Sequence, residues 1–176
     1  DLAPSVKTTN IAKNYPELFF QSGIQEHNTA AVAGACSAEG VLTYWADFGV
    51  FGVAETFNQH RLNDINGTNY KVVCTHVGLD VGEDGKTHQC IDYVGVFQNL
   101  FGFKVIVPAD PNQTDRATRY ISATPGNFLL AMGRSKMGMV LNEAGEPFYG
   151  SGYSFVYGKA DLIRTGARGA IIAMGG

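Results

Sequence analysis

Two kinds of segment alternate along the chain: short apolar runs, and longer segments in which apolar residues recur with helical spacing. The short runs are rich in Val, Ile, Phe and Tyr and are bounded by Gly, Pro, Asn or Asp, which favours buried strands. The predicted strands cover residues 17–22, 41–48, 70–76, 103–109, 127–132 and 169–174. The predicted helices cover residues 24–38, 50–65, 90–101 and 111–123.

This order of elements predicts an α/β fold. Strands that are nearly continuous in apolar residues are typical of a parallel sheet buried on both faces. We therefore predict a parallel sheet of about six strands covered by helices on both faces. Ligands of such sheets bind at the loops that follow the carboxyl ends of the strands.

The length of 176 residues fits about one domain. We predict one domain over residues 1–150, followed in residues 151–176 by a connector and the start of a C-terminal domain. Residues 140–165 are rich in Gly, Tyr and Phe and lack a helical period, which indicates a connector. The chain begins in the loop-like "DLAPS", so we expect a fragment or one subunit of a larger enzyme.

The charge, the lack of a long apolar run and the cysteine pattern exclude several classes of protein. A net charge of −3 without a basic stripe argues against nucleic acid as a partner. The chain has no long apolar run, so we expect no membrane segment. Its cysteines lie far apart and form no C-x-x-C pair, which argues against disulfides or zinc and favours a cytoplasmic location.

The loop "THVGLDVGEDGKTHQ", residues 75–89, concentrates histidines, acids and glycines. It is either a plain polar loop or part of a ligand pocket, because glycines let the backbone approach a ligand closely. A metal site is also conceivable, but the histidines and acids lack the i, i+4 spacing of helical ligands. Its members would be His76, Asp80, Asp84 and His88.

Three further positions have both a structural and a functional interpretation. Phe48 and Phe51 follow a strand and either pack in the core or stack on a flat heterocycle. Arg134 follows another strand and is either a surface residue or an anion clamp. Glu26, near the start of a helix, is a solvated residue, a helix-start anion or a buried acid kept for catalysis.

Taken together, six segments resemble the pyrimidine-binding domain of transketolase, a thiamine-diphosphate enzyme. They occur in the family's order and cover most of residues 1–136. The resemblance implies transfer of a two-carbon ketol unit between sugar phosphates in the pentose phosphate pathway. The segments are "DLAPS", "GIQEHN", "DFGVF", "THVGLDVGEDGKTHQ", "VIVPADPNQ" and "GRSK".

The resemblance also implies roles toward the cofactor. Glu26 matches the glutamate that hydrogen-bonds N1′ of the pyrimidine and promotes its imino tautomer, which requires a buried carboxyl with raised proton affinity. Phe48 and Phe51 match the aromatic residues around the aminopyrimidine. Asp1 matches an acid near the cofactor, and His88 a histidine that assists proton transfer.

For the substrate, the resemblance implies a second set of residues. His76 and Asp84 match residues that bind the hydroxyls of the sugar. Ser5 and Arg134 match the residues that hold its phosphate.

The chain departs from the family pattern at several points. Ala54 stands where many members have a third aromatic residue, and Lys86 replaces a common proline. The G-D-G motif with a distant Asn does not occur, so the Mg²⁺ and diphosphate site is expected in a separate domain or subunit. The resemblance thus implies a homodimer or heterotetramer, and we expect this chain to be inactive by itself.

Two alternatives remain open. A deoxyxylulose-phosphate synthase has a similar plan, but this family usually carries arginine where His76 stands. A non-catalytic regulatory subunit is the other alternative.

Overall fold

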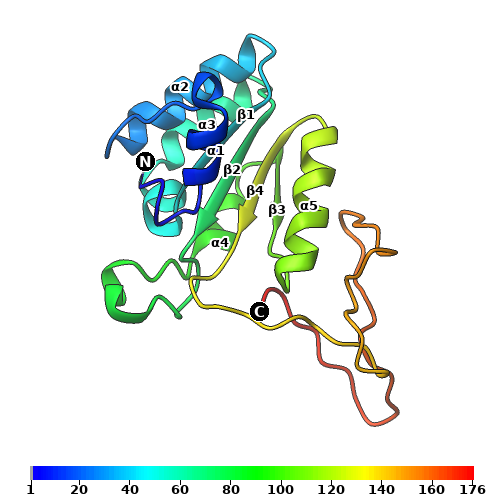
Figure 1. The fold of residues 1–176 in the computed structure, drawn as a ribbon. Helices are drawn as coiled ribbons and strands as arrows, with labels where there is room; N and C mark the ends of the chain where they lie inside the picture. The colour runs from blue at the N-terminus through cyan, green and yellow to red at the C-terminus, as the bar shows by residue number, and fades with distance from the viewer. Residues whose placement is uncertain (1) are drawn as a thin grey trace.

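The computed structural model describes residues 2–176 and contains one parallel sheet. The strands lie in the order β1-β2-β4-β3, so the predicted parallel α/β architecture is confirmed, with four strands rather than about six (Figure 1). They are β1 (Thr43–Phe48), β2 (Tyr70–Thr75), β3 (Phe103–Ile106) and β4 (Asn127–Ala131).

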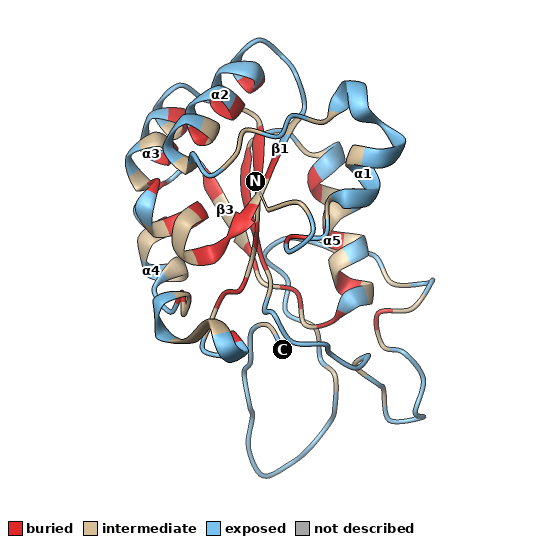
Figure 2. Ribbon diagram, turned by 60° about the vertical axis from the view of Figure 1, so that its left-hand side comes forward, coloured by how far each residue is buried: buried red, intermediate tan, exposed pale blue. Residues whose placement is uncertain are grey.

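Helices cover both faces of the sheet. Figure 2 shows α2, α3 and α4 on one side of it and α1 and α5 on the other. Among residues 2–176, no helix is both long and apolar enough to cross a membrane. The α-helices are α1 (Thr9–Asn14), α2 (Glu26–Ala38), α3 (Phe57–Ile65), α4 (Tyr93–Phe97) and α5 (Pro111–Ala123). The chain also forms two 3₁₀ turns, η1 (Pro16–Leu18) and η3 (Gly82–Thr87), and a π-helix, η2 (Val50–Glu55).

Two apolar clusters hold the layers together, one on each face of the sheet. Successive side chains of a strand point to opposite faces. Leu129 of β4 therefore joins the cluster under α2 and α4, while Phe128 and Leu130 join the cluster under α5. Both faces of β4 are fully covered, which is why its sequence, "NFLLA", shows no alternation of polar and apolar residues.

The predicted strands at 17–22 and 169–174 are wrong. Pro16 starts the 3₁₀ turn η1, and Leu18, 78% exposed, has no neighbouring strand to cover it. In 169–174 the apolar Ile171 is 97% exposed and no strand lies alongside. Both segments have the apolar composition of a strand but lack a pairing partner among residues 2–176.

Two helix predictions also need correction. The segment 50–65 is two helices, because η2 has π geometry and is followed by α3. Gly52 permits this close packing, since a Cβ there would lie 2.9 Å from Sγ of Cys74. The segment 90–101 is helical only over α4, and the short α1 was not predicted.

Residues 132–176, all of them described, form an extended arm without a regular helix or strand (Figure 1). The first part of the arm is held at the start of α5, because Oδ2 of Asp110 accepts the N–H of Val140 at 2.9 Å. Tyr153 donates to Asp161 at 2.7 Å within the arm, and Phe155 packs against the α5 cluster. The boundary at residue 150 stays a prediction.

Candidate functional site

Most of the candidate residues gather at one edge of the sheet. Phe48 ends β1, His76 directly follows β2, and Arg134 lies just beyond β4. The strands are parallel, so their carboxyl ends meet at one edge. Glu26 starts α2, which packs on β1 and runs in the opposite direction, so this residue lies at the same edge.

An aromatic and imidazole cluster forms the centre of the site. The ring of Phe48 stacks on that of His76, with centroids 4.0 Å apart. His88, from the loop 75–89, places its ring edge-on to Phe51 with centroids 5.3 Å apart, and 5.8 Å from Phe48. Phe48 is buried and Phe51 is half-buried, so the second ring retains an accessible surface.

The backbone and a neighbouring threonine hold His76 in place. Its φ of 59° lies in the left-handed region, which is uncommon outside glycine and occurs repeatedly at functional sites. Nδ1 lies 2.9 Å from the hydroxyl of Thr75, and Nε2 lies 3.5 Å from Oδ2 of Asp84. Burial lowers the pKa of His76 although Asp84 opposes this effect, so the ring is neutral at pH 7. A neutral ring that accepts from Thr75 presents Nε2–H to the carboxylate.

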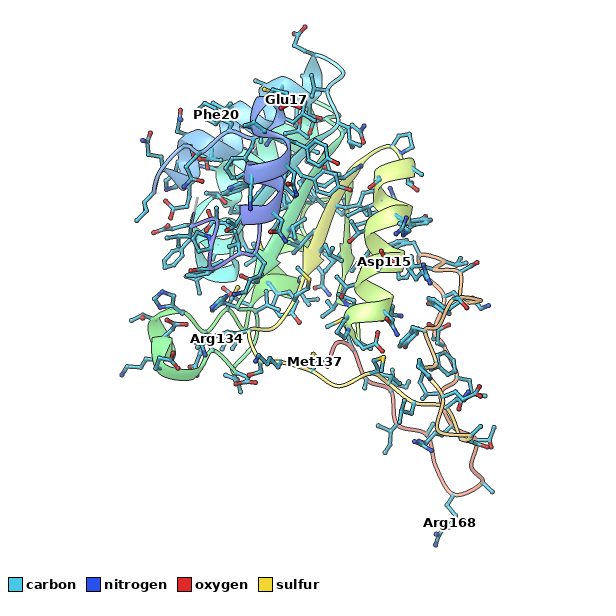
Figure 3. All side chains as sticks on the ribbon, viewed as in Figure 1. Glu17, Phe20, Asp115, Arg134, Met137 and Arg168 are labelled. Carbon is cyan, nitrogen blue, oxygen red and sulfur yellow. The ribbon has the colours of Figure 1, made fainter. Side chains whose placement is uncertain are left out.

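Ion pairs link Arg134 to the turn η3. Its Nη2 lies 2.7 Å from Oε1 of Glu83, and its Nε lies 3.2 Å from Oδ2 of Asp84. Gly82 allows the guanidinium to approach, because a Cβ there would clash with Nη1 of Arg134. Figure 3 shows Arg134 beside this loop. The structure thus brings together Arg134, Asp84 and His76.

Glu26 is half-buried in this chain, and its charge raises the pKa of a second acid, Asp47. Burial contributes most to the rise in the pKa of Asp47, to about 6, and the carboxylates of Glu26 and Glu55 raise it further. Residues 2–176 do not provide the full burial that the resemblance implies for Glu26.

The amino-terminal candidates are less closely joined to the cluster. Ser5 is exposed in a turn closed by its own N–H to the carbonyl of Leu2 at 2.8 Å. The charge of Lys7 lowers the pKa of His76, so the turn that contains Ser5 lies near the site. No hydrogen bond joins the described residues Ser5 and Arg134. Asp1 lies outside the described residues.

Sequence reasoning missed the residues that support the cluster. Thr75 and Thr87 contact Nδ1 of His76 and His88, at 2.9 Å and 3.0 Å. Adjacent Thr-His pairs in the loop were the available signal. Asp47 was also missed, although a carboxylate inside an otherwise apolar strand is unusual.

A buried network supports the π-helix that carries Phe51. Nε2 of His60 lies 2.8 Å from the carbonyl oxygen of Gly52 and 3.0 Å from the hydroxyl of Thr56, and Nδ1 contacts the hydroxyl of Tyr70. Burial lowers the pKa of His60 to about 4, so its ring is neutral and donates to the Gly52 carbonyl. π-Helical turns are frequent at functional sites.

The remaining candidates do not form a metal cluster. Within residues 2–176, no three His, Cys, Asp or Glu side chains lie where they could hold one ion. His76 and Asp84 approach each other, but Asp80 is exposed.

Residues 1–139 match the sequence profile of the family described as transketolase, pyrimidine binding domain. The chain belongs to this family. The site described above lies entirely within the matched residues.

Individual relatives agree with this assignment. A putative transketolase C-terminal section from Methanocaldococcus jannaschii is 29% identical over 176 residues, which cover 99% of this chain and 54% of that protein. Transketolase-like protein 2 of Mus musculus is 28% identical over 164 residues, 93% of this chain and 25% of that protein. The chain thus spans about half of the first relative and a quarter of the second.

A solved structure has the same fold. A split gene transketolase, described as an inactive beta4 tetramer, superposes with a TM-score of 0.77 and 29% identity. The match covers 94% of this chain and 51% of that chain. The fold of this chain is therefore shared with that structure over most of its length.

Proposed function

We propose that this chain is the pyrimidine-binding part of a thiamine-diphosphate-dependent transketolase that transfers a two-carbon ketol unit between sugar phosphates. The observation that carries the proposal is the cluster of Phe48, His76 and His88 beside Asp84 and Arg134, at the same sheet edge as Glu26. This cluster lies within the residues that match the family.

The residues present fit the pyrimidine half of the cofactor. Glu26 keeps part of its surface exposed, so its carboxylate can face a ring nitrogen and share a proton with it. Phe51 offers a partly exposed ring surface for the flat pyrimidine, backed by Phe48. When bound, thiamine diphosphate supplies the nucleophilic carbon that receives the ketol unit. Asp1 is proposed as a further acid near the cofactor.

The polar residues of the cluster are proposed to hold the sugar phosphate. His76 donates from Nε2, and Asp84 accepts from sugar hydroxyls. His88 is oriented through Nδ1 by Thr87, which leaves Nε2 to move a proton at the reacting carbons. Arg134 and Ser5 bind the phosphate, for which Arg134 exchanges carboxylate partners for phosphate oxygens.

A second domain or subunit is required to complete the enzyme. We propose that it supplies the Mg²⁺ and diphosphate site in a homodimer or heterotetramer. Two observations support this: the chain spans about half of a split gene transketolase chain, and apolar side chains such as Phe20, 73% exposed, need a cover. Figure 3 shows Phe20 on the side of the molecule away from the arm.

Reconstitution tests the proposal. The chain is mixed with a diphosphate-binding transketolase subunit, Mg²⁺ and thiamine diphosphate, and transfer from xylulose 5-phosphate to ribose 5-phosphate is measured. We expect activity in the mixture and none with the chain alone. Glu26→Gln should reduce kcat by roughly 10²- to 10⁴-fold, the usual share of acid–base catalysis.

A matched control comes from the other end of the same helix. Glu39→Gln removes the exposed carboxylate of the residue that follows α2, and it should leave kcat unchanged. Wild-type activity in Glu26→Gln would refute the proposal and favour a non-catalytic subunit. Turnover of pyruvate in place of xylulose 5-phosphate would instead indicate a deoxyxylulose-phosphate synthase.

A further inference from the structure

Asp47 has one carboxylate oxygen for which residues 2–176 provide no hydrogen-bond partner. The residue is 1% exposed and lies one position before the end of β1. Its Oδ1 accepts the N–H of Phe48 at 2.7 Å. Its Oδ2 is buried and has no hydrogen-bond partner among residues 2–176. An ionised carboxylate with a buried, unpaired oxygen is strongly disfavoured, so Asp47 must either hold a proton or change its surroundings.

Among residues 2–176, the groups that act on Asp47 include no positive side chain. The Cβ of Asp47 lies 3.1 Å from where a Cβ of Gly52 would be, so the residue packs against η2, whose Glu55 is acidic. Cys74 of β2 lies on the same side and contributes only a buried thiol. From α2 the facing charge is that of Glu26.

The direction of β1 determines which helix Asp47 faces. Trp45, two residues earlier on the same strand, belongs to the cluster under α2, so Asp47 points to that face. Helix α2 runs antiparallel to β1, which places its first residue, Glu26, at the level of Asp47. The two acids thus lie at different depths, because Glu26 is half-buried and Asp47 is buried.

We propose that Asp47 is a positioning residue of the pyrimidine site: its protonated carboxyl anchors the backbone of Phe48, and on ionisation its charge acts on Glu26 from inside the protein. The proposal rests on the proposed function, because it concerns a site in which Glu26 shares a proton with the cofactor. Burial and the charge of Glu26 raise the pKa of Asp47 to about 6, which is consistent with this arrangement.

The charge state of Asp47 has a direct effect at Glu26. While Asp47 is neutral, it does not repel the carboxylate of Glu26. When Asp47 loses its proton, two carboxylates repel each other, and the repulsion favours a proton held between Glu26 and the nitrogen that it faces. The strength of the contact between Glu26 and the cofactor should therefore change with pH where Asp47 titrates.

The first test uses the 176-residue chain alone and needs no activity. The carboxyl carbon of Asp47 is followed by NMR during a pH titration of the wild type, Glu26→Gln and Glu39→Gln. We expect a midpoint of about 6 in the wild type, a lower midpoint in Glu26→Gln and no change in Glu39→Gln. A midpoint near the ordinary value of 3.8, or the same midpoint in Glu26→Gln as in the wild type, would overturn the proposal.

The second test measures cofactor binding in the reconstituted enzyme. Asp47→Asn keeps an oxygen for the Phe48 N–H but carries no charge at any pH. Asp115→Asn, on the exposed surface of α5, is its control. We expect the Kd for thiamine diphosphate to change several-fold between pH 5 and 7 in the wild type and the control, and this change to be absent in Asp47→Asn.

The two tests separate this proposal from the proposed function. If Glu26→Gln is inactive but Asp47→Asn has the same Kd profile as the wild type, the role of Asp47 is refuted and the enzyme assignment stands. If Glu26→Gln remains fully active, the proposed function fails, and the proposal for Asp47 fails with it. Should Asp47→Asn not fold, the titration of the natural Asp47 in Glu26→Gln still decides the question.

Discussion

Phe48 and His76 stack with ring centroids 4.0 Å apart and an interplanar angle of 37°. The strand register explains the contact, because Phe48 pairs with Thr75 and His76 follows directly. One ring is contributed by β1 and the other by the turn after β2. This contact therefore ties the aromatic side of the site to its polar side, where Asp84 and Arg134 lie.

Replacing Phe48 by Ala should cost about 3 kcal/mol in the free energy of unfolding, because a buried ring leaves a cavity. The change should also admit water to His76 and so raise its pKa toward the ordinary value, since burial lowers it in the wild type. Urea unfolding and an NMR titration of His76 measure the two effects. Phe101→Ala removes a ring that is 98% exposed and should change neither. Equal effects of the two substitutions would contradict the structure.

Gly52→Ala should destabilise the chain by about 1–3 kcal/mol through overpacking. The added Cβ would lie 2.9 Å from Sγ of Cys74 and 3.1 Å from Cβ of Asp47. Gly95→Ala, in α4, has no heavy atom within 4 Å of the new Cβ and should be neutral or stabilising by up to about 1 kcal/mol. Thermal unfolding of both variants checks this contrast, and a harmless Gly52→Ala would show that η2 packs differently.

His60 and Asp47 should give opposite pH dependences of stability. His60 has a pKa of about 4 in the folded state, below its ordinary 6.5. Its contribution to the free energy of unfolding is therefore lost as the pH falls from 6.5 to 4. Asp47 has a pKa of about 6, above its ordinary 3.8, so its contribution is lost as pH rises from 3.8 to 6. Each contribution amounts to about 3 kcal/mol, because each pH unit between the folded and unfolded pKa values is worth about 1.36 kcal/mol.

Substitutions separate the two contributions. Relative to the wild type, Asp47→Asn should make stability rise more steeply with pH between 4 and 6, because the opposing loss is removed. His60→Gln should make it rise less steeply, since the unfolded state no longer takes up the extra proton. Urea unfolding at several pH values measures the slopes, and identical slopes in all three proteins would show that neither group titrates as described.

Asp110→Ala should cost about 1–2 kcal/mol, because the side chain caps α5 through Oδ1 and the N–H of Gln113 at 2.7 Å. It should also release the arm, since Oδ2 accepts the N–H of Val140. Asp110→Asn keeps an oxygen for only one of these two donors and should have a smaller effect. Hydrogen exchange at Val140 and urea unfolding separate the roles; slow exchange at Val140 in Asp110→Ala would mean that the arm is held elsewhere.

Arg134→Lys should weaken binding of the phosphorylated sugar in the reconstituted enzyme but have a smaller effect on the stability of the enzyme. The reason is that an ammonium group cannot reproduce the planar, two-pronged geometry of the guanidinium. We expect KM for ribose 5-phosphate to rise several-fold and kcat to change little. Glu83→Gln removes only the exposed partner of this ion pair, and it should leave the free energy of unfolding unchanged. An unchanged KM in Arg134→Lys would exclude Arg134 from the phosphate site.

The hydrophobic pattern predicts the sheet well where strands are buried on both faces. All four strands from β1 to β4 begin within two residues of the predicted positions, because burial on both faces leaves each strand nearly continuous in apolar residues. The same reasoning fails at 17–22 and 169–174, since an apolar run shows that a segment needs cover but not that the cover is a strand of this chain. The π geometry of η2 depends on contacts with Cys74 and His60, which sequence spacing does not reveal.

For the site, residue types at strand ends were enough to bring His76, Asp84 and Arg134 together, because the topology places the strand ends side by side. Pairing between side chains could not be predicted. The engagement of Arg134 by two carboxylates, and the unpaired oxygen of Asp47, depend on side-chain positions a few ångströms apart. The roles of Glu26, Ser5 and Asp1 stay predictions.

The left-handed backbone at His76 also limits how this protein can change by mutation. Gly and Asn adopt this conformation at little cost, whereas β-branched residues do so only with strain. Two constraints therefore limit which substitutions are tolerated at this position: the chemistry of the imidazole ring and the left-handed backbone conformation. A library of all substitutions at His76, sorted only for folding, should retain Gly and Asn and lose Val, Ile and Thr, even where no substrate is ever supplied.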